Sequence, residues 1–239
     1  MLLSQIRQIR QRQPQIGGRK LYHILKGFME EIEFACGRDR FFDLLRDHKL
    51  LVERRKKYVY TTNSRHRFRI YSNLVNTLEL TMSNQVYVAD ITYIRTLAGF
   101  CYLSLITDAC SRKIVGYHLS RSLGIEGSLK ALKMALRQNG NIEGLIHHSD
   151  RGIQYCSKAY TDLLERHAIK ISMTEQNHVY ENALAERVNG ILKEEFLLGQ
   201  TLVNFNVAKK MVKQAIEIYN NERPHLSLNY DTPSVRHVA

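Results

Sequence analysis

The order of the expected secondary-structure elements between residues 85 and 196 constrains the fold most strongly. Period-two alternation of apolar residues predicts three strands in succession, joined by tight turns and therefore antiparallel neighbours. Helix and strand periods then alternate along the chain. The expected strands and helices cover residues 86–91, 100–107, 113–119, 126–138, 145–148, 158–167, 169–173 and 181–196, and a further helix follows at 207–219. The order βββαβαβα predicts an α/β domain with a mixed sheet and helices on its faces.

Three carboxylates lie where such a sheet brings distant parts of the chain together. Asp90 is on the first expected strand, Asp150 directly follows the fourth strand, and Glu186 is on the helix after the fifth. The spacing between Asp150 and Glu186 is weak support by itself, so the structural context carries the argument. Converging carboxylate oxygens suit hard cations such as Mg²⁺. The pattern therefore predicts a metal-binding cluster of acids.

The helix that carries Glu186 has two contrasting faces. Its apolar side consists of Leu184, Val188 and Ile191. The opposite side, at i, i+4, i+7 and i+11, consists of Asn182, Glu186, Asn189 and Lys193. A solvated face would also be polar, yet an acid, two amides and a base in helical register suit a surface that grips both a metal and a phosphate chain. Lys193 is therefore a candidate DNA contact, and a solvated lysine is the alternative.

Positive charge is concentrated in the first 80 residues, which hold 17 Lys and Arg against 8 Asp and Glu in a chain of net charge +12. Such an excess favours a polyanionic partner, most commonly nucleic acid. Short amphipathic helices before residue 53 fit a small helix-turn-helix DNA-binding module, although generic three-helix packing gives a similar pattern. A basic linker with interleaved aromatic residues follows at 54–80, as in segments that track phosphates. Its candidate DNA contacts are Arg54, Arg55, Lys56 and Lys57.

The composition argues against several other classes of protein. No apolar run of about 18 residues and no secretory leader occurs, so a membrane span or export is not expected and the cytoplasm is the default compartment. The four cysteines are scattered and lack zinc-ligand spacing, so reduced thiols are expected rather than disulfides or a zinc site.

Several motifs, in the right order, resemble one family. They are GRDRFFDLLRDHKLL in the helical module, NQVYVADITYI around Asp90, LITDACSRKIVGYHLS, HHSDRGIQYCS around Asp150, YENALAERVNGILKEE around Glu186 and YNNERPHLSLNYDTP. The chain thereby resembles the insertion-sequence transposases of the retroviral-integrase (DDE) superfamily, of the OrfB type with two overlapping reading frames. The resemblance implies a helix-turn-helix module over 1–53, a basic linker over 54–80 and a ribonuclease-H-like core over 81–239. Tyr87 departs from the family, which usually has Trp there.

The resemblance also implies a function. Asp90, Asp150 and Glu186 would bind two Mg²⁺ ions, with Mn²⁺ able to substitute, for 3′-end cleavage and strand transfer of an insertion sequence. The implied partners are DNA at the element ends and the target, further copies of the chain on DNA, and an upstream-frame protein with a helix-turn-helix and a leucine zipper. No membrane is implied, and the expected location is the bacterial cytoplasm, in association with the nucleoid.

The sequence also offers further candidate DNA contacts and two alternative functions. Asn182, Arg187, Asn189 and His148 are further candidate DNA contacts, whereas Asp108 is expected to form a turn. A strand-end position such as that of His148 is equally compatible with a structural role. A non-catalytic DNA-binding protein, such as a repressor or a decayed element copy, is one alternative, and a ribonuclease-H-like nuclease without strand transfer is another. The presence of all three acids argues against decay.

Overall fold

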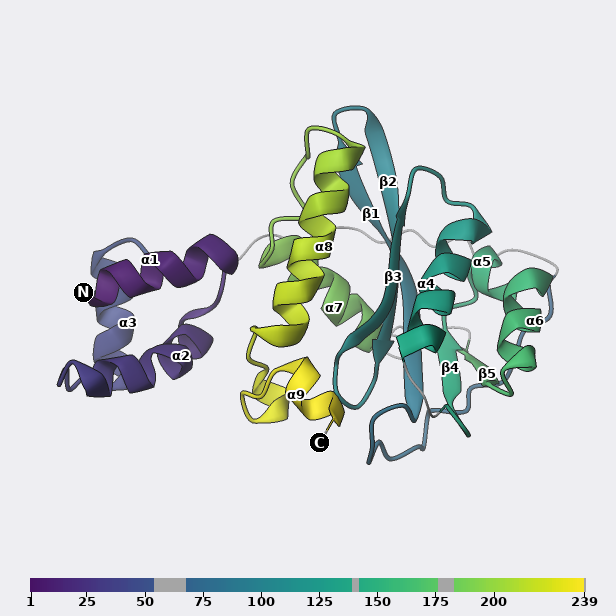
Figure 1. The fold of residues 1–239 in the computed structure, drawn as a ribbon, viewed down its shortest axis with the longest axis horizontal. Coiled ribbons are helices and arrows are strands. Elements are labelled where there is room, and N and C mark those ends of the chain that lie inside the picture. Colours follow the sequence, from purple (N-terminus) through teal and green to yellow (C-terminus); the bar gives the residue numbers. More distant parts are fainter. Residues whose placement is uncertain (54–67, 139–141, 176–182, 239) are drawn as a thin grey trace.

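The computed structural model describes residues 1–53, 68–138, 142–175 and 183–238 (Figure 1). Three helices come first: α1 (Leu2–Arg12), α2 (Gly18–Glu31) and α3 (Arg38–Asp47). Their apolar stripes meet in a hydrophobic cluster of their own, in which Ile6, Leu21 and Phe41 have no exposed surface. The three predicted N-terminal helices therefore form, while their contact with DNA stays a prediction.

The sheet contains all five predicted strands. They are β1 (Val86–Thr96), β2 (Gly99–Asp108), β3 (Ile114–Ser120), β4 (Ile146–Ser149) and β5 (Lys170–Met173). Their order in space is β3-β2-β1-β4-β5, in which β1, β2 and β3 are antiparallel neighbours while β4 and β5 are parallel to β1. The prediction of a mixed sheet is confirmed.

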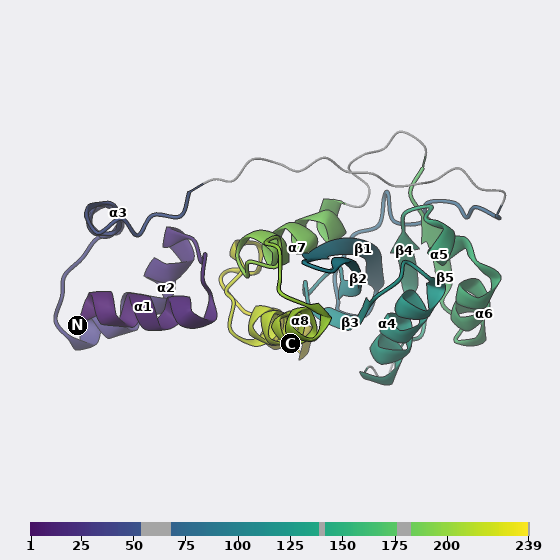
Figure 2. The ribbon, with the colours of Figure 1, turned by 90° about the horizontal axis from the view of Figure 1, so that it is seen from above.

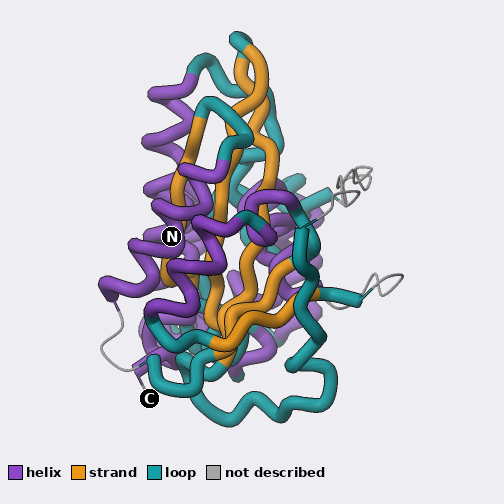
Figure 3. Tube along the Cα trace, turned by 90° about the vertical axis from the view of Figure 1, so that its right-hand side faces the viewer, coloured by secondary structure: helices purple, strands orange, loops and turns teal. Residues whose placement is uncertain are grey.

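The hairpin of β1 and β2 turns between Thr96 and Gly99 and projects beyond the other strands (Figure 3). Pairing between the two strands continues as far as Thr96 and Gly99. Gly99 has φ of +112°, a backbone conformation that side chains with a Cβ rarely adopt, so glycine is required at this turn. The extension follows from the tight turn, because it brings the two strands together along their whole length.

Helices cover both faces of the sheet (Figure 2). One face carries α4 (Ile125–Gln138), the short α5 (Ile153–Cys156) and α6 (Lys158–Arg166), and the other carries α7 (Ala183–Glu194) and α8 (Phe205–Asn221). A separate hydrophobic cluster fills each interface, because successive strand residues point to opposite faces. A 3₁₀ turn (Leu226–Leu228) and α9 (Pro233–Val238) end the described chain. Within these ranges every helix is too short or too polar to cross a lipid bilayer.

Candidate active site

Asp90 lies on β1 and points toward the face of the sheet that α7 covers. Its side chain is 5% exposed. One carboxylate oxygen accepts a hydrogen bond of 2.6 Å from the amide nitrogen of Asn189 on α7, and the other accepts one of 2.8 Å from the backbone N–H of Ile91. The acid is therefore held in one orientation by its own strand and by the neighbouring helix.

Asp150 follows β4, the parallel neighbour of β1. Ala89 pairs with Ser149 across these strands, so Asp90 and Asp150 are the next residues on each side of the pair. Asp150 accepts a hydrogen bond of 3.0 Å from the backbone N–H of Gly152, which turns the chain into α5. A Cβ on Gly152 would come within 2.9 Å of an oxygen of that carboxylate, so a larger residue at the exit turn would displace the Asp150 side chain.

Glu186 lies in the first turn of α7, and its side chain is exposed. The N-terminal end of a helix favours negative charge, because its backbone N–H groups lack partners within the helix. Burial raises the pKa of Asp90 to about 8, with further contributions from the charges of Asp150 and Glu186. The fold thus brings the three predicted acids within electrostatic reach of one another.

Lys193 approaches the same cluster from α7. It is half-buried, and burial lowers its pKa while the charge of Asp90 opposes that shift. A lysine in this position would be close to any phosphate that reaches Asp90, because the charges of Lys193 and Asp90 act on each other. Its contact with DNA stays a prediction that this position favours.

The donor set fits a hard divalent cation, because it consists of carboxylate oxygens whose mutual repulsion a cation would relieve. Among the described residues, however, no three His, Cys, Asp or Glu side chains lie close enough to enclose a metal ion. The Glu186 side chain is exposed in the first turn of α7, so its rotatable bonds let the carboxylate change position. Asp90, Asp150 and Glu186 are therefore the residues of this site that could hold a metal.

Two candidate DNA contacts, His148 and Asn189, are buried. His148 has no exposed surface, and its Nδ1 lies 2.9 Å from the hydroxyl of Ser172 on β5. This burial favours a structural role for His148, and its contact with DNA stays a prediction that this position does not support. Asn189 is 7% exposed and its amide nitrogen donates to Asp90, so the structure gives it a part in orienting that acid, while its contact with DNA stays a prediction.

Of the remaining candidate DNA contacts, only Arg187 lies within the described residues. Arg187 is exposed on α7, and its contact with DNA stays a prediction. The other candidates lie outside the described residues: Asn182, Arg54, Arg55, Lys56 and Lys57. Asp108 forms a turn as expected, since its buried carboxylate accepts hydrogen bonds from the backbone N–H groups of Asn84 and Ser111 at 2.8 and 2.7 Å.

A buried ionic contact that the sequence did not reveal joins the N-terminal helices to α7. Glu195, just beyond that helix, accepts hydrogen bonds of 2.8 Å from Lys20 on α2 and of 2.8 Å from Arg223. Its backbone carbonyl also accepts a hydrogen bond of 3.1 Å from the N–H of Gln15. No sequence signal links these residues, since they come from three separate regions of the chain.

Comparison with known proteins defines the class of this fold. Residues 81–178 match an integrase core domain family, and residues 167–233 match a second family with the same description. The HTLV-2 integrase catalytic core, solved in complex with magnesium, superimposes with a TM-score of 0.53 at 18% identity over 65% of this chain and 97% of that one. The sheet is therefore that of the ribonuclease-H-like integrase cores.

Two relatives then give the particular group. An uncharacterized 31 kDa protein of insertion element IS600 from Shigella sonnei is 40% identical over 208 residues, which is 86% of this chain and 76% of that protein. The transposase InsF of IS3A from Escherichia coli is 36% identical over 143 residues, 59% of this chain and 50% of InsF. The chain belongs to the insertion-sequence transposases of the DDE integrase superfamily. Its enzyme class is accordingly that of the polynucleotidyl transferases.

Proposed function

We propose that this chain cleaves DNA at the 3′ ends of an insertion sequence and then joins those ends to target DNA. In the first step water attacks phosphorus and the bond from phosphorus to the 3′ oxygen breaks. In the second, the freed 3′ hydroxyl attacks another phosphodiester, whose own 3′ oxygen leaves. Each step exchanges one P–O bond for another, so no nucleotide cofactor is needed. The observation that carries the proposal is that the charges of Asp150 and Glu186 both act on the buried Asp90.

The same three acids are the proposed ligands of two Mg²⁺ ions, with Mn²⁺ able to substitute. The pKa of Asp90 is raised mainly by burial and further by the charges of Asp150 and Glu186, and a bound cation would offset both effects, which supports this assignment. The magnesium complex of the HTLV-2 integrase core supports it as well. When bound, such ions would stabilise the charge that develops on the attacking and leaving oxygens of the phosphate.

Asn189 and Lys193 would assist the acids in different ways. By donating to one oxygen of Asp90, Asn189 keeps that carboxylate from rotating, so its remaining lone pairs keep a constant direction. Lys193 would hold a phosphate of the DNA end beside the acids, since it reaches the cluster from the same helix. Neither residue takes part in bond making or breaking in this proposal.

We also propose that three segments of the chain have different functions. Residues 1–53 would contact DNA through the helical module, 54–80 would follow the phosphate backbone, and 81–239 would carry out catalysis. Pairing two DNA ends requires more than one protomer, so the chain would form oligomers on DNA. An upstream-frame protein with a helix-turn-helix and a leucine zipper is the proposed further partner, and the bacterial nucleoid is the proposed location.

Plasmid nicking tests the proposal directly. The intact chain is incubated with supercoiled plasmid and Mg²⁺ or Mn²⁺, beside Glu186→Gln and a matched control, Glu194→Gln, which changes an exposed acid at the other end of α7. We expect nicking by the wild type and the control and its loss in Glu186→Gln, with DNA binding retained in all three. Nicking that survives Glu186→Gln would refute the assigned site.

Joining is tested separately with an end-labelled duplex and a plasmid target. A duplex with a 3′ hydroxyl should be joined to the plasmid, whereas one with a 3′-dideoxy end should not. Nicking without joining would favour a nuclease. Salt-sensitive DNA binding without either reaction would favour the non-catalytic DNA-binding alternative.

A further inference from the structure

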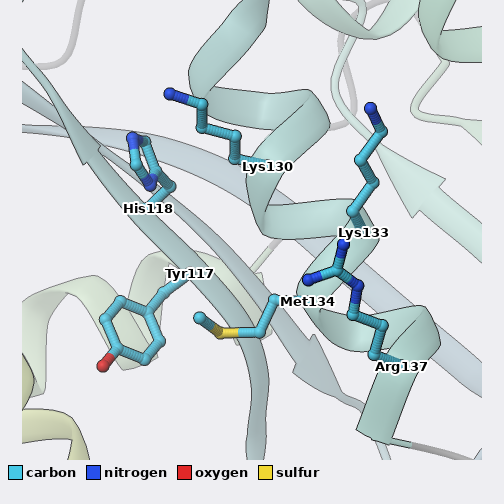
Figure 4. Close-up of a pocket in the computed structure, with 6 residues that line it drawn as sticks. All are labelled: Tyr117, His118, Lys130, Lys133, Met134 and Arg137. Carbon is cyan, nitrogen blue, oxygen red and sulfur yellow. The ribbon is translucent and has the colours of Figure 1, made fainter.

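A basic groove lies on the other side of the sheet from the acids. It has a volume of about 360 Å³ and runs between the edge strand β3 and helix α4 (Figure 4). The residues that line it are Tyr117, His118, Lys130, Lys133, Met134 and Arg137. Asp90 instead faces α7, which covers the opposite face of the sheet. The groove is therefore separate from the acid cluster.

The cations of α4 form one stripe. Lys130, Lys133 and Arg137 occupy positions i, i+3 and i+7, so they project from one side of the helix along about 10 Å at 1.5 Å per residue. All three side chains are exposed. Within the part of the chain that the structure describes, none of them forms an ion pair.

A cation on a neighbouring helix, α8, adds to the positive charge beside the groove. Burial lowers the pKa of His118 on β3, and the charges of Lys130 and Lys209 lower it further. Lys209 belongs to α8, so cations from helices on both faces of the sheet surround the edge strand. Burial raises the pKa of Tyr117, and the charge of Glu217 on α8 raises it further. The groove thus gathers positive charge from α4 and α8, and the lowered pKa of His118 favours its neutral form.

We propose that this groove binds the phosphate backbone of duplex DNA at a place separate from the acid cluster. The proposal rests on the proposed function in one respect, namely that DNA is the polymer on which the chain acts. Each strand of duplex DNA carries one phosphate per about 3.4 Å of the helix axis, so a stripe of about 10 Å spans roughly three phosphates of one backbone. Unpaired cations at this spacing match such a polymer, and they would hold it without reading its sequence.

Binding in this groove would raise affinity without altering the chemical step. It would keep a second stretch of DNA, such as the flanking or the target duplex, on the enzyme while the acids act elsewhere. Phosphate contacts of this kind release counterions, so they make affinity depend on salt. The groove should therefore influence the salt dependence of binding and leave the rate at saturating DNA unchanged.

The test compares two triple variants of the intact chain. The groove variant is Lys130→Gln, Lys133→Gln and Arg137→Gln. The control removes three exposed cations on the distant α6 and β5 side of the sheet by the changes Lys158→Gln, Arg166→Gln and Lys170→Gln. Both variants lose the same charge, so any difference reports the position of the cations and not their number.

Binding to a random-sequence duplex is measured by fluorescence anisotropy over a series of salt concentrations. The slope of log affinity against log salt should become shallower by about 0.9 for each lost phosphate contact, which is roughly 2–3 for the groove variant. Affinity at low salt should fall at least tenfold in that variant and no more than about twofold in the control. Equal slopes for the two variants, with both folded by thermal denaturation, would overturn the proposal.

Two further measurements distinguish DNA binding in the groove from peptide binding there and from the proposed catalytic function. Polyglutamate serves as an acidic-peptide probe, because an edge strand can also accept a peptide. Loss of polyglutamate binding with unchanged DNA binding would make the groove a peptide site and overturn the proposal. Metal-dependent nicking at saturating DNA reports on the acids alone. If the wild type never nicks but its DNA binding shows the groove-dependent salt slope, the proposed function is refuted and the proposal that the groove binds DNA stands.

Discussion

Replacing Glu195 with alanine should cost about 3 kcal/mol of unfolding free energy and release the N-terminal helices from the core. The Glu195 carboxylate lies between Lys20 and Arg223, and the three side chains are 18%, 11% and 3% exposed. Removing the acid leaves two cations facing each other away from water. The structure contains no other contact of this kind between α2 and the end of α7 among its described residues.

The magnitude follows from the degree of burial. Exposed ion pairs contribute about 0–1 kcal/mol, whereas breaking a buried pair costs about 3–5 kcal/mol, because one charge then stays buried without a partner. Glu195 retains some exposure, which places the cost at the lower end of that range, and Arg223 is almost fully buried. Alanine at 195 should therefore cost clearly more than the loss of a surface pair.

The pH dependence has a definite sign. Burial alone would raise the pKa of Glu195, but the hydrogen bond and charge of Arg223, together with Lys20, outweigh it and lower the pKa. A carboxyl with a lowered pKa in the folded state stabilises the fold above its ordinary pKa. That contribution is lost as pH falls through the ordinary Glu range toward the lowered value. The wild type and Glu195→Ala should thus differ most near neutral pH and converge in acid.

Urea denaturation near neutral pH and in acid provides the assay. Glu194→Ala is the matched control, because it changes the adjacent, exposed acid, and it should alter the unfolding free energy by less than about 0.5 kcal/mol. Limited proteolysis of the native proteins reports whether the N-terminal helices are docked, and Glu195→Ala should be cut faster before the core. A cost below about 1 kcal/mol for Glu195→Ala would refute the reasoning, since a desolvated contact cannot be so weak.

Two further predictions concern the metal cluster and the packing of β3. Since the pKa of Asp90 is raised to about 8, its ionised form destabilises the fold, and the metal-free wild type should lose stability as pH rises from the ordinary Asp range to about 8. Asp90→Asn should remove that loss in thermal denaturation, together with nicking and most of the stabilisation by Mg²⁺; an unchanged pH profile would contradict the burial of the acid. Gly116→Ala should cost about 3 kcal/mol or more, because its Cβ would come within 2.2 Å of the carbonyl oxygen of Ala131. The control Gly190→Ala, with nothing within 4 Å in α7, should gain about 0.5–1 kcal/mol, and equal melting temperatures for these two variants would refute the packing of α4 on β3.

Local pattern was enough to predict most elements of the core. The alternation along 86–91 and the helical period along 126–138 each report which side of an element is buried, and β1 and α4 form there. The four-residue helix α5 was missed, because one turn is too short for a period to be recognised. Strand β1 continues beyond the alternating residues 86–91, because its far end pairs with β2 as far as Gly99.

The sequence by itself determined the class of fold, the three acids and the side of α7 on which Glu186, Asn189 and Lys193 lie. Only the tertiary structure decided which groups those side chains meet: Asn189 binds Asp90, and His148 bonds to Ser172 inside the sheet. The joining of Glu195 to two cations from distant regions was also a tertiary result. The physical reason is that periodicity records how much of a side chain is buried. The identity of its partner depends on how separate elements pack, and no local pattern contains that information.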